Sequence, residues 1–68
     1  MVKFLLREVR EENHVSLRAL SALSGVSKNY LNEIENGKAN PTISILCDIV
    51  CALDVPIERI VQCVKNNT

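Results

Sequence analysis

Apolar residues recur at intervals of three and four along most of the chain, which is the period of one face of an α-helix. This spacing predicts five amphipathic helices, over residues 2–12, 17–23, 28–36, 43–53 and 56–64. We find no strand pattern, repeat or low-complexity linker, and we expect no β-sheet. The pattern therefore predicts an all-α fold of five short helices around one small core.

Residues that favour helix ends fall between these segments. Ser16, Ser27 and Thr42 precede the second, third and fourth helices, where a hydroxyl can accept a hydrogen bond from a free backbone N–H. Gly25 lets the chain turn after the second helix, and Gly37 supplies a left-handed stop after the third. The second and third helices are thus joined by a tight corner, which is how small proteins present a helix to the major groove of DNA.

Length and composition narrow the classes of protein to consider. The 68 residues suffice for a single domain, residues 1–68, with the helix-turn-helix at about residues 17–36. Asp48 interrupts the longest apolar run, and the apolar stretch before Arg7 is too short for a signal-peptide core, so we expect neither a membrane span nor a signal peptide. These observations predict a cytoplasmic protein with no membrane partner.

The residues that carry chemistry do not form a catalytic pattern. We interpret the three cysteines, Cys47, Cys51 and Cys63, as small packing residues in a reducing compartment, and we predict no metal site. His14 has no partner placed to make it a base or a ligand, and no nucleophile, carboxylate pair or glycine-rich phosphate loop can be assembled. We therefore predict that the protein is not an enzyme, with no cofactor and no small-molecule substrate.

Four segments, in this order and at this spacing, resemble the Cro and phage-repressor (Xre-type) family of helix-turn-helix regulators. They are L-R-E-V-R-E-E-N-H-V-S, G-V-S-K-N-Y-L-N-E-I-E-N-G-K, P-T-I and L-D-V-P, and the resemblance covers residues 6–60. It implies a compact five-helix lambda-repressor-like DNA-binding domain. It also implies that the second helix crosses the sugar-phosphate backbone while the third lies in the major groove.

The exposed stripe of the third helix carries groups that can read base edges. An ammonium group suits guanine, an amide suits adenine, and a carboxylate can accept a hydrogen bond from cytosine. An ordinary solvated helix face is the alternative, because polar residues are common on any exposed stripe. The predicted base contacts are Ser27, Lys28, Asn29, Asn32 and Glu33.

Phosphate contacts are expected at the start of the second helix and in the loop after the third. The family resemblance implies a phosphate-binding glutamine at the position where this chain has Leu17. Leucine cannot donate that hydrogen bond, so Arg18 is expected to replace part of the contact. For Tyr30, a phosphate contact through the hydroxyl and a ring that only packs both stay open. The candidates are Ser16, Leu17, Arg18, Tyr30, Asn36, Lys38 and Asn40.

A structural ion pair and a homodimer complete the prediction. The resemblance implies that Arg10 on the first helix pairs with Glu35 at the end of the third, and an ordinary solvent-facing pair is the alternative. One recognition helix reads only a few base pairs, so we expect a homodimer on a pseudo-palindromic operator. The predicted dimer surface consists of apolar residues of the last helix, Ile57, Ile60, Val61 and Val64.

Charge limits how tightly such a protein can hold DNA of random sequence. The chain has eight basic and eight acidic residues and a net charge of zero, while residues 16–42 carry three basic and two acidic residues, net +1. Binding to random DNA is therefore expected to be weak and sensitive to salt. We predict a transcriptional repressor that binds double-stranded DNA. The alternative is a protein-interaction module on the same fold, either antitoxin-like or an assembly partner.

Overall fold

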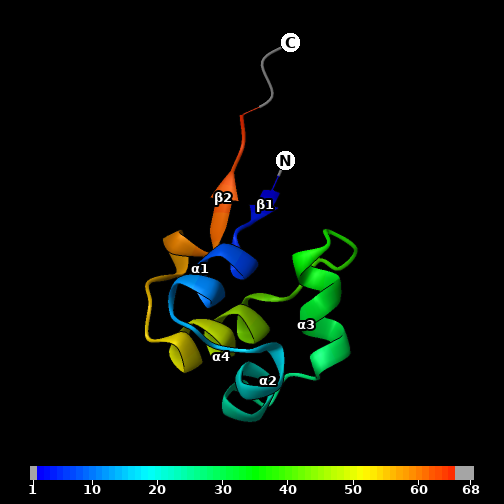
Figure 1. Cartoon of the computed structure of the whole chain (residues 1–68). Helices are drawn as coiled ribbons and strands as arrows, with labels where there is room; N and C mark the ends of the chain where they lie inside the picture. The colour runs from blue at the N-terminus through cyan, green and yellow to red at the C-terminus, as the bar shows by residue number, and fades with distance from the viewer. Residues whose placement is uncertain (1, 66–68) are drawn as a thin grey trace.

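The computed structural model describes residues 2–65, which form four α-helices, one short 3-10 helix and a two-stranded sheet (Figure 1). In chain order the elements are β1 (Val2–Phe4), α1 (Leu6–Glu12), α2 (Leu17–Ser24), α3 (Lys28–Glu35), α4 (Ile43–Leu53), η1 (Ile57–Arg59) and β2 (Val61–Cys63). The four helices form the body of the molecule, and the sheet projects from it beyond α1 (Figure 1).

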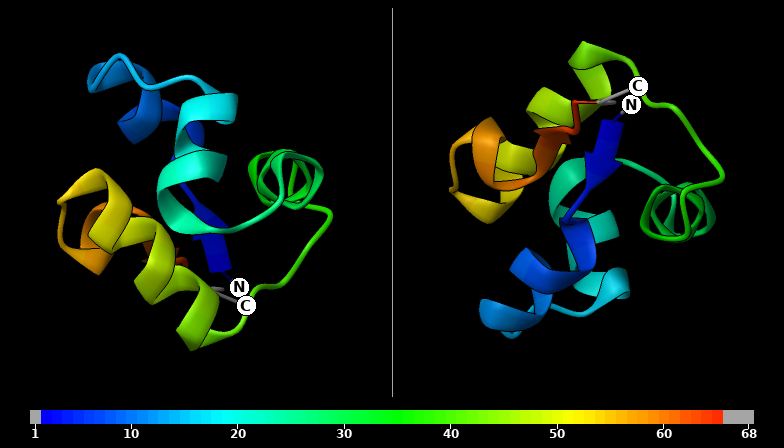
Figure 2. Two further views of the ribbon diagram at one scale, coloured as in Figure 1. Left: turned by 90° about the horizontal axis from the view of Figure 1, so that it is seen from below. Right: turned by 90° about the horizontal axis from the view of Figure 1, so that it is seen from above.

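A single apolar core holds the helices together. Each of the four α-helices contributes at least one buried side chain, because the residues spaced by three and four along each helix face the same centre. Figure 2 shows α2 and α4 side by side, with α3 on the other side of α2. The buried apolar residues are Leu6, Val9, Leu20, Val26, Leu31, Ile34, Leu46, Ile49, Leu53 and Ile60.

The predicted N-caps of α2, α3 and α4 are present. The hydroxyls of Ser16, Ser27 and Thr42 accept hydrogen bonds from the backbone N–H three residues later, at 3.0, 3.1 and 3.3 Å. Each bond satisfies one of the N–H groups that a helix leaves free at its start. Polar residues at these three positions therefore fix where each helix begins.

The two ends of the chain differ from the prediction of a purely helical fold. Val2–Phe4 does not begin the first helix but pairs antiparallel with Val61–Cys63, and the expected fifth helix is only one 3-10 turn, followed by a strand. Each end has an apolar residue on either side of a polar one, which suits a strand that is covered on one face. Pairing satisfies backbone groups of both ends, and Phe4 and Val61 pack against the helical core.

Not every apolar residue at helical spacing is buried. Leu23 is 65% exposed at the end of α2, and Ile43 is exposed at the start of α4. Cys47, Cys51 and Cys63 are exposed thiols, so the interpretation of these cysteines as packing residues is wrong. Helical spacing places a residue on a face, but the ends of a short helix extend past the neighbours that would cover them.

Candidate nucleic-acid interface

The corner between α2 and α3 is held by hydrogen bonds from two serines. Gly25 ends α2 in the left-handed region at φ +77°, and its N–H donates to the carbonyl of Ser21 at 3.0 Å. The hydroxyl of Ser21 then donates to the carbonyl of Val26 at 2.6 Å, and the N–H of Val26 donates to the hydroxyl of Ser24 at 3.2 Å. Because Val26 is also buried in the core, the angle between the two helices is fixed.

The exposed face of α3 begins at this corner. Leu31 and Ile34 are buried on its inner face, so the helix is anchored along its length. The five residues predicted to contact base edges are all exposed at the N-cap and along α3. They are Ser27, Lys28, Asn29, Asn32 and Glu33. The arrangement presents one ammonium group, two amides, one hydroxyl and one carboxylate on a rigid helix.

The end of α3 is fixed by a Schellman motif. The N–H of Gly37, at φ +72°, donates to the carbonyl of Ile34 at 3.1 Å, and the N–H of Lys38 donates to the carbonyl of Glu33 at 2.8 Å. These bonds set the direction in which the chain leaves the helix. They hold Lys38 at a defined place beside the C-terminal end of α3.

The residues predicted to contact phosphate lie at both ends of the helix pair. Ser16, Arg18, Asn36, Lys38 and Asn40 are exposed. Leu17 is half-buried and packs against the core, as does Tyr30, whose ring therefore has a packing role whether or not its hydroxyl reaches phosphate. Asn36 already accepts a hydrogen bond from Arg7 through its side-chain oxygen.

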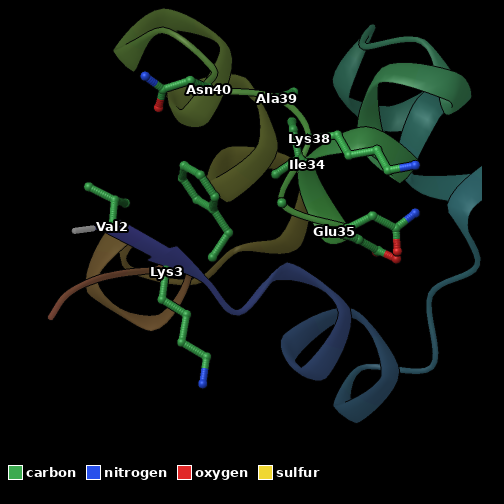
Figure 3. A pocket seen from close by; sticks show the side chains of 10 residues that line it. Val2, Lys3, Ile34, Glu35, Lys38, Ala39 and Asn40 are labelled. Carbon is green, nitrogen blue, oxygen red and sulfur yellow. The ribbon is translucent and has the colours of Figure 1, made fainter.

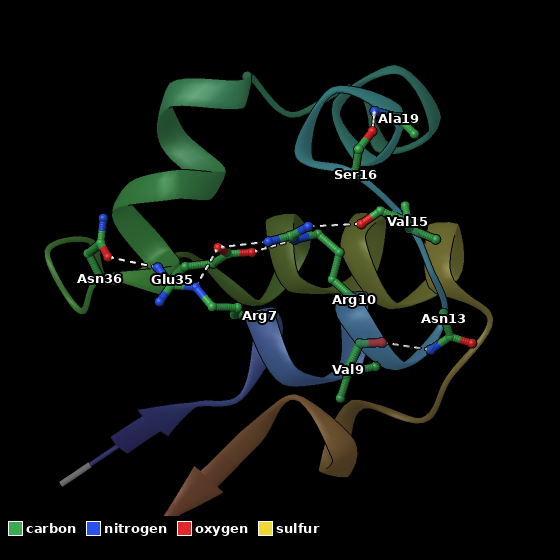
Figure 4. Close-up of polar contacts among 9 residues, drawn as sticks. All are labelled: Arg7, Val9, Arg10, Asn13, Val15, Ser16, Ala19, Glu35 and Asn36. Carbon is green, nitrogen blue, oxygen red and sulfur yellow. Dashed lines mark hydrogen bonds and ion pairs between the residues drawn. The ribbon is translucent and has the colours of Figure 1, made fainter.

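Two arginines converge on the carboxylate of Glu35, whose side chain is 1% exposed (Figure 4). Arg10 Nε lies 2.7 Å from Glu35 Oε2 and Arg10 Nη2 lies 3.3 Å from Oε1, while a third nitrogen, Nη1, donates to the carbonyl of Val15 at 2.9 Å. The hydrogen bond to Glu35 raises the pKa of Arg10 above its ordinary value. The pair ties α1 to the last residue of α3.

Arg7 is the second partner of Glu35, and the sequence reasoning missed it. Its Nε lies 3.3 Å from Glu35 Oε1, and its Nη2 donates to the side-chain oxygen of Asn36 at 3.1 Å. Arg7 precedes Arg10 by three residues, so both lie on one face of α1, and that spacing was the available signal. The cluster carries two positive charges and one negative charge next to the loop that contains Lys38.

The residues predicted to form a dimer surface do not share one face. Ile60 is fully buried in the core of the monomer, so it cannot contact a partner, and the prediction for this residue is wrong. Ile57 and Val61 are half-buried against that core, and Val64 is exposed. Because η1 and β2 replace the expected fifth helix, the single apolar stripe on which this prediction depended is absent.

An open groove of about 610 Å³ separates β1 from the loop that follows α3 (Figure 3). Its lining includes the apolar residues Val2, Phe4, Ile34 and Ala39, together with Lys3 and polar residues of the segment 35–40. Within residues 2–65, no group of histidine, cysteine or acidic side chains is placed to hold a metal ion. No helix in the same range is long and apolar enough to cross a membrane.

A corner locked by serines, followed by a polar helix, is the geometry of the helix-turn-helix, and the comparison with protein families agrees. The helix-turn-helix family profile HTH_3 matches residues 6–60, most of the chain. The chain belongs to this family. The helix-turn-helix family matched here consists of DNA-binding transcription regulators rather than enzymes, as the sequence predicted.

Individual relatives carry the same family description. The chain is 43% identical over 53 residues to an uncharacterized HTH-type transcriptional regulator, Rv0474, of Mycobacterium tuberculosis, covering 78% of this chain and 38% of the relative. It is 34% identical over 63 residues to the HTH-type transcriptional regulator SinR of Bacillus subtilis, covering 91% of this chain and 57% of SinR. The chain thus spans about two fifths to three fifths of the length of these curated relatives.

Solved structures of helix-turn-helix proteins share the fold. The restriction-modification controller protein C.AhdI from Aeromonas hydrophila aligns with a TM-score of 0.76 at 30% identity, over 79% of this chain and 82% of that chain. The SinR protein/SinI protein complex aligns with a TM-score of 0.72 at 35% identity, over 78% of this chain and 52% of that chain. The helical body is therefore the lambda-repressor-like arrangement, with four α-helices and the added sheet among the described residues.

Proposed function

We propose that the protein is a sequence-specific transcriptional regulator, and that residues 1–68 act as one DNA-binding domain with α3 in the major groove of double-stranded DNA. The observation that carries the proposal is the exposed polar face of α3, which starts at a capped corner and ends at a Schellman motif. These two features hold both ends of α3 in place. A recognition helix must be held in this way, because the geometry of base contacts tolerates little movement. Family membership supports the choice of DNA as the partner.

The side chains of that face suit different bases. Lys28 can donate to the O6 and N7 of guanine, and the amides of Asn29 and Asn32 can donate to and accept from adenine. Glu33 can accept a hydrogen bond from the amino group of cytosine, and the hydroxyl of Ser27 can contact a base or its phosphate. We expect Lys28 and Asn29 to contribute most, because they lie in the first turn of α3, beside the corner.

Phosphates are held at both ends of the helix pair in this proposal. The N-terminal end of α2 offers free backbone N–H groups next to Arg18, and the loop after α3 offers Lys38 and Asn40. The half-buried side chain of Leu17 makes no polar contact, so only its backbone can take part. The ammonium group of Lys38 and the 47%-exposed side chain of Arg7 are the cations on this side that a phosphate could meet.

We further propose that the protein acts as a homodimer on a pseudo-palindromic operator and represses by steric occlusion of a promoter. A lone recognition helix reads too few base pairs to select one site in a genome, whereas two helices related by a two-fold axis double the sequence that is read. The net charge of zero makes specific contacts from two copies all the more necessary. Such a regulator acts where the DNA is, in the cytoplasm.

A second candidate function keeps the fold and replaces DNA with a protein partner, as an antitoxin-like or assembly module. Two observations favour it: the net charge is zero, and a leucine occupies the position where a phosphate-binding side chain is expected. A similar solved chain, in the SinR protein/SinI protein complex, is bound to another protein. In this alternative the exposed face of α3 would contact protein rather than base pairs.

Selection of bound sequences from random DNA, followed by salt-dependent gel shifts, tests the proposal. The selected site should be nearly palindromic, and affinity should fall steeply as salt is added. Lys28→Ala with Asn29→Ala should lower affinity for that site by about 5- to 150-fold per lost base contact, while Lys65→Ala, which removes a charge outside the interface, should change it little. Failure to select any sequence would favour the protein partner.

A further inference from the structure

We propose that two copies of this chain pair through the outer edge of β2, which we call the β2 edge and define as residues 61–63. The inference rests on the homodimer of the proposed function and assigns its surface. Pairing two β2 strands antiparallel about a two-fold axis would convert two separate two-stranded sheets into one four-stranded sheet. Its strand order would be β1, β2, then β2 and β1 of the partner subunit.

The direction of the backbone groups identifies an edge with unused hydrogen-bonding capacity. The N–H of Leu5 donates to the carbonyl of Ile60 at 2.7 Å, and the register pairs Lys3 with Gln62. Alternate residues of a strand direct their backbone groups to opposite sides, so Gln62 faces β1. Val61 and Cys63 must therefore direct their N–H and C=O groups outward, away from β1.

Charge distinguishes this edge from the outer edge of β1. If two β1 strands paired with full overlap, Lys3 would lie opposite Lys3 of the partner subunit, and like charges at that spacing destabilise a sheet. The β1 side also borders the groove and the loop after α3, and no residue of β2 lines that groove (Figure 3). The β2 edge, Val61, Gln62 and Cys63, contains no charged residue.

The β2 edge is complementary to a second copy of itself. Full antiparallel overlap places Gln62 opposite Gln62 of the partner subunit, where two amides can exchange hydrogen bonds. It places Val61 opposite Cys63 of the partner subunit, so the apolar face of each strand continues across the axis. One symmetric register thus satisfies the outward backbone groups and matches side chains on both faces.

The position and size of the sheet support the same partner. A two-stranded sheet of three residues per strand is marginal alone, and addition of two further strands stabilises it. The sheet projects from the helical body on the side where α3 ends, so a second copy can approach it without meeting the corner between α2 and α3 (Figure 1). The exposed face of α3 would stay free to contact DNA in such a dimer.

Introducing a charge at position 62 tests the pairing without DNA, by sedimentation equilibrium. Gln62→Lys should raise the dissociation constant of the dimer about fivefold or more, because two lysines would meet across the axis. Gln62→Glu should raise it less, because Lys3 lies beside position 62 within each chain. An equimolar mixture of the two variants should form a heterodimer at least as stable as the native dimer; a mixture as weak as either variant overturns the proposal.

Disulfide trapping locates the axis, using chains in which Cys47, Cys51 and Cys63 are replaced by serine. Gln62→Cys would bring two Cα atoms within about 4.5 Å, inside the range that a disulfide spans. We expect this variant to form a cross-linked dimer under mild oxidation and the matched Lys3→Cys variant to stay unlinked. Linking through position 3 instead, linking at neither position, or a native chain that sediments as a monomer overturns the proposal.

These measurements separate the dimer surface from the proposed function. Selection of DNA sequences by the native chain depends on α3, and sedimentation without DNA depends on the β2 edge. A protein that selects an operator but gives no cross-link at position 62 keeps the proposed function and loses this interface. A protein that forms the predicted dimer and binds no DNA loses the proposed function and keeps the interface.

Discussion

Replacement of Arg10 by alanine would remove the closer of the two arginine partners of Glu35, whose side chain is 1% exposed, and leave the 3.3 Å bond from Arg7. It removes two hydrogen bonds to Glu35 and one to the carbonyl of Val15. Stranding a buried charge costs ~3 to 5 kcal/mol, and we expect the lower end because Arg7 stays 3.3 Å from one carboxylate oxygen. In a domain of this size that loss lowers Tm by ~12 to 24 °C, at ~4 to 8 °C per kcal/mol.

Thermal and urea unfolding, followed by circular dichroism, measures the effect. Two matched arginine variants serve as controls. Arg7→Ala removes a 47%-exposed side chain and should cost ~0 to 1 kcal/mol, as should Arg59→Ala, whose partner Glu12 is also solvent-exposed. The Arg10 variant should therefore melt far below both.

The cause of the loss can be tested separately from its size. If a stranded charge is responsible, adding Glu35→Gln to Arg10→Ala should recover part of the lost stability, because the amide has no charge to bury. A double variant less stable than Arg10→Ala alone would contradict the argument. Equal melting temperatures for Arg10→Ala and Arg7→Ala would refute the description of the Arg10 pair as buried.

Three further substitutions test the local structure, each by urea unfolding. Ser27→Ala removes the hydroxyl that accepts from the N–H of Tyr30, and should cost ~1 kcal/mol; an unchanged midpoint would mean that the cap contributes nothing. Leu20→Ala, in the core, should cost ~2 to 5 kcal/mol, whereas the 65%-exposed Leu23→Ala should stay within ~0.5 kcal/mol; similar losses would contradict the burial of α2. Gly25→Ala should cost ~1 to 2 kcal/mol, because alanine is strained at φ +77°, and Gly25→Asn should cost less.

Sequence alone determined the features that depend on a few neighbouring residues. The caps at Ser16, Ser27 and Thr42 and the left-handed turns at Gly25 and Gly37 follow from side-chain and backbone geometry within one turn. The polar face of α3 follows from helical spacing. For these reasons the corner and the set of residues proposed to read DNA were predictable before the fold was known.

Tertiary structure decided whatever depends on residues distant in the chain. Val2–Phe4 is a strand because Val61–Cys63 lies beside it, and their separation along the sequence leaves no local signal of the pairing. Spacing places Arg7 on the same face of α1 as Arg10, but only the fold brings Glu35, 28 residues away, within reach of it. The exposure of Leu23 likewise depends on which residues of other elements cover the end of α2. Spacing places a residue on a face, and only packing against the rest of the chain decides what that face meets.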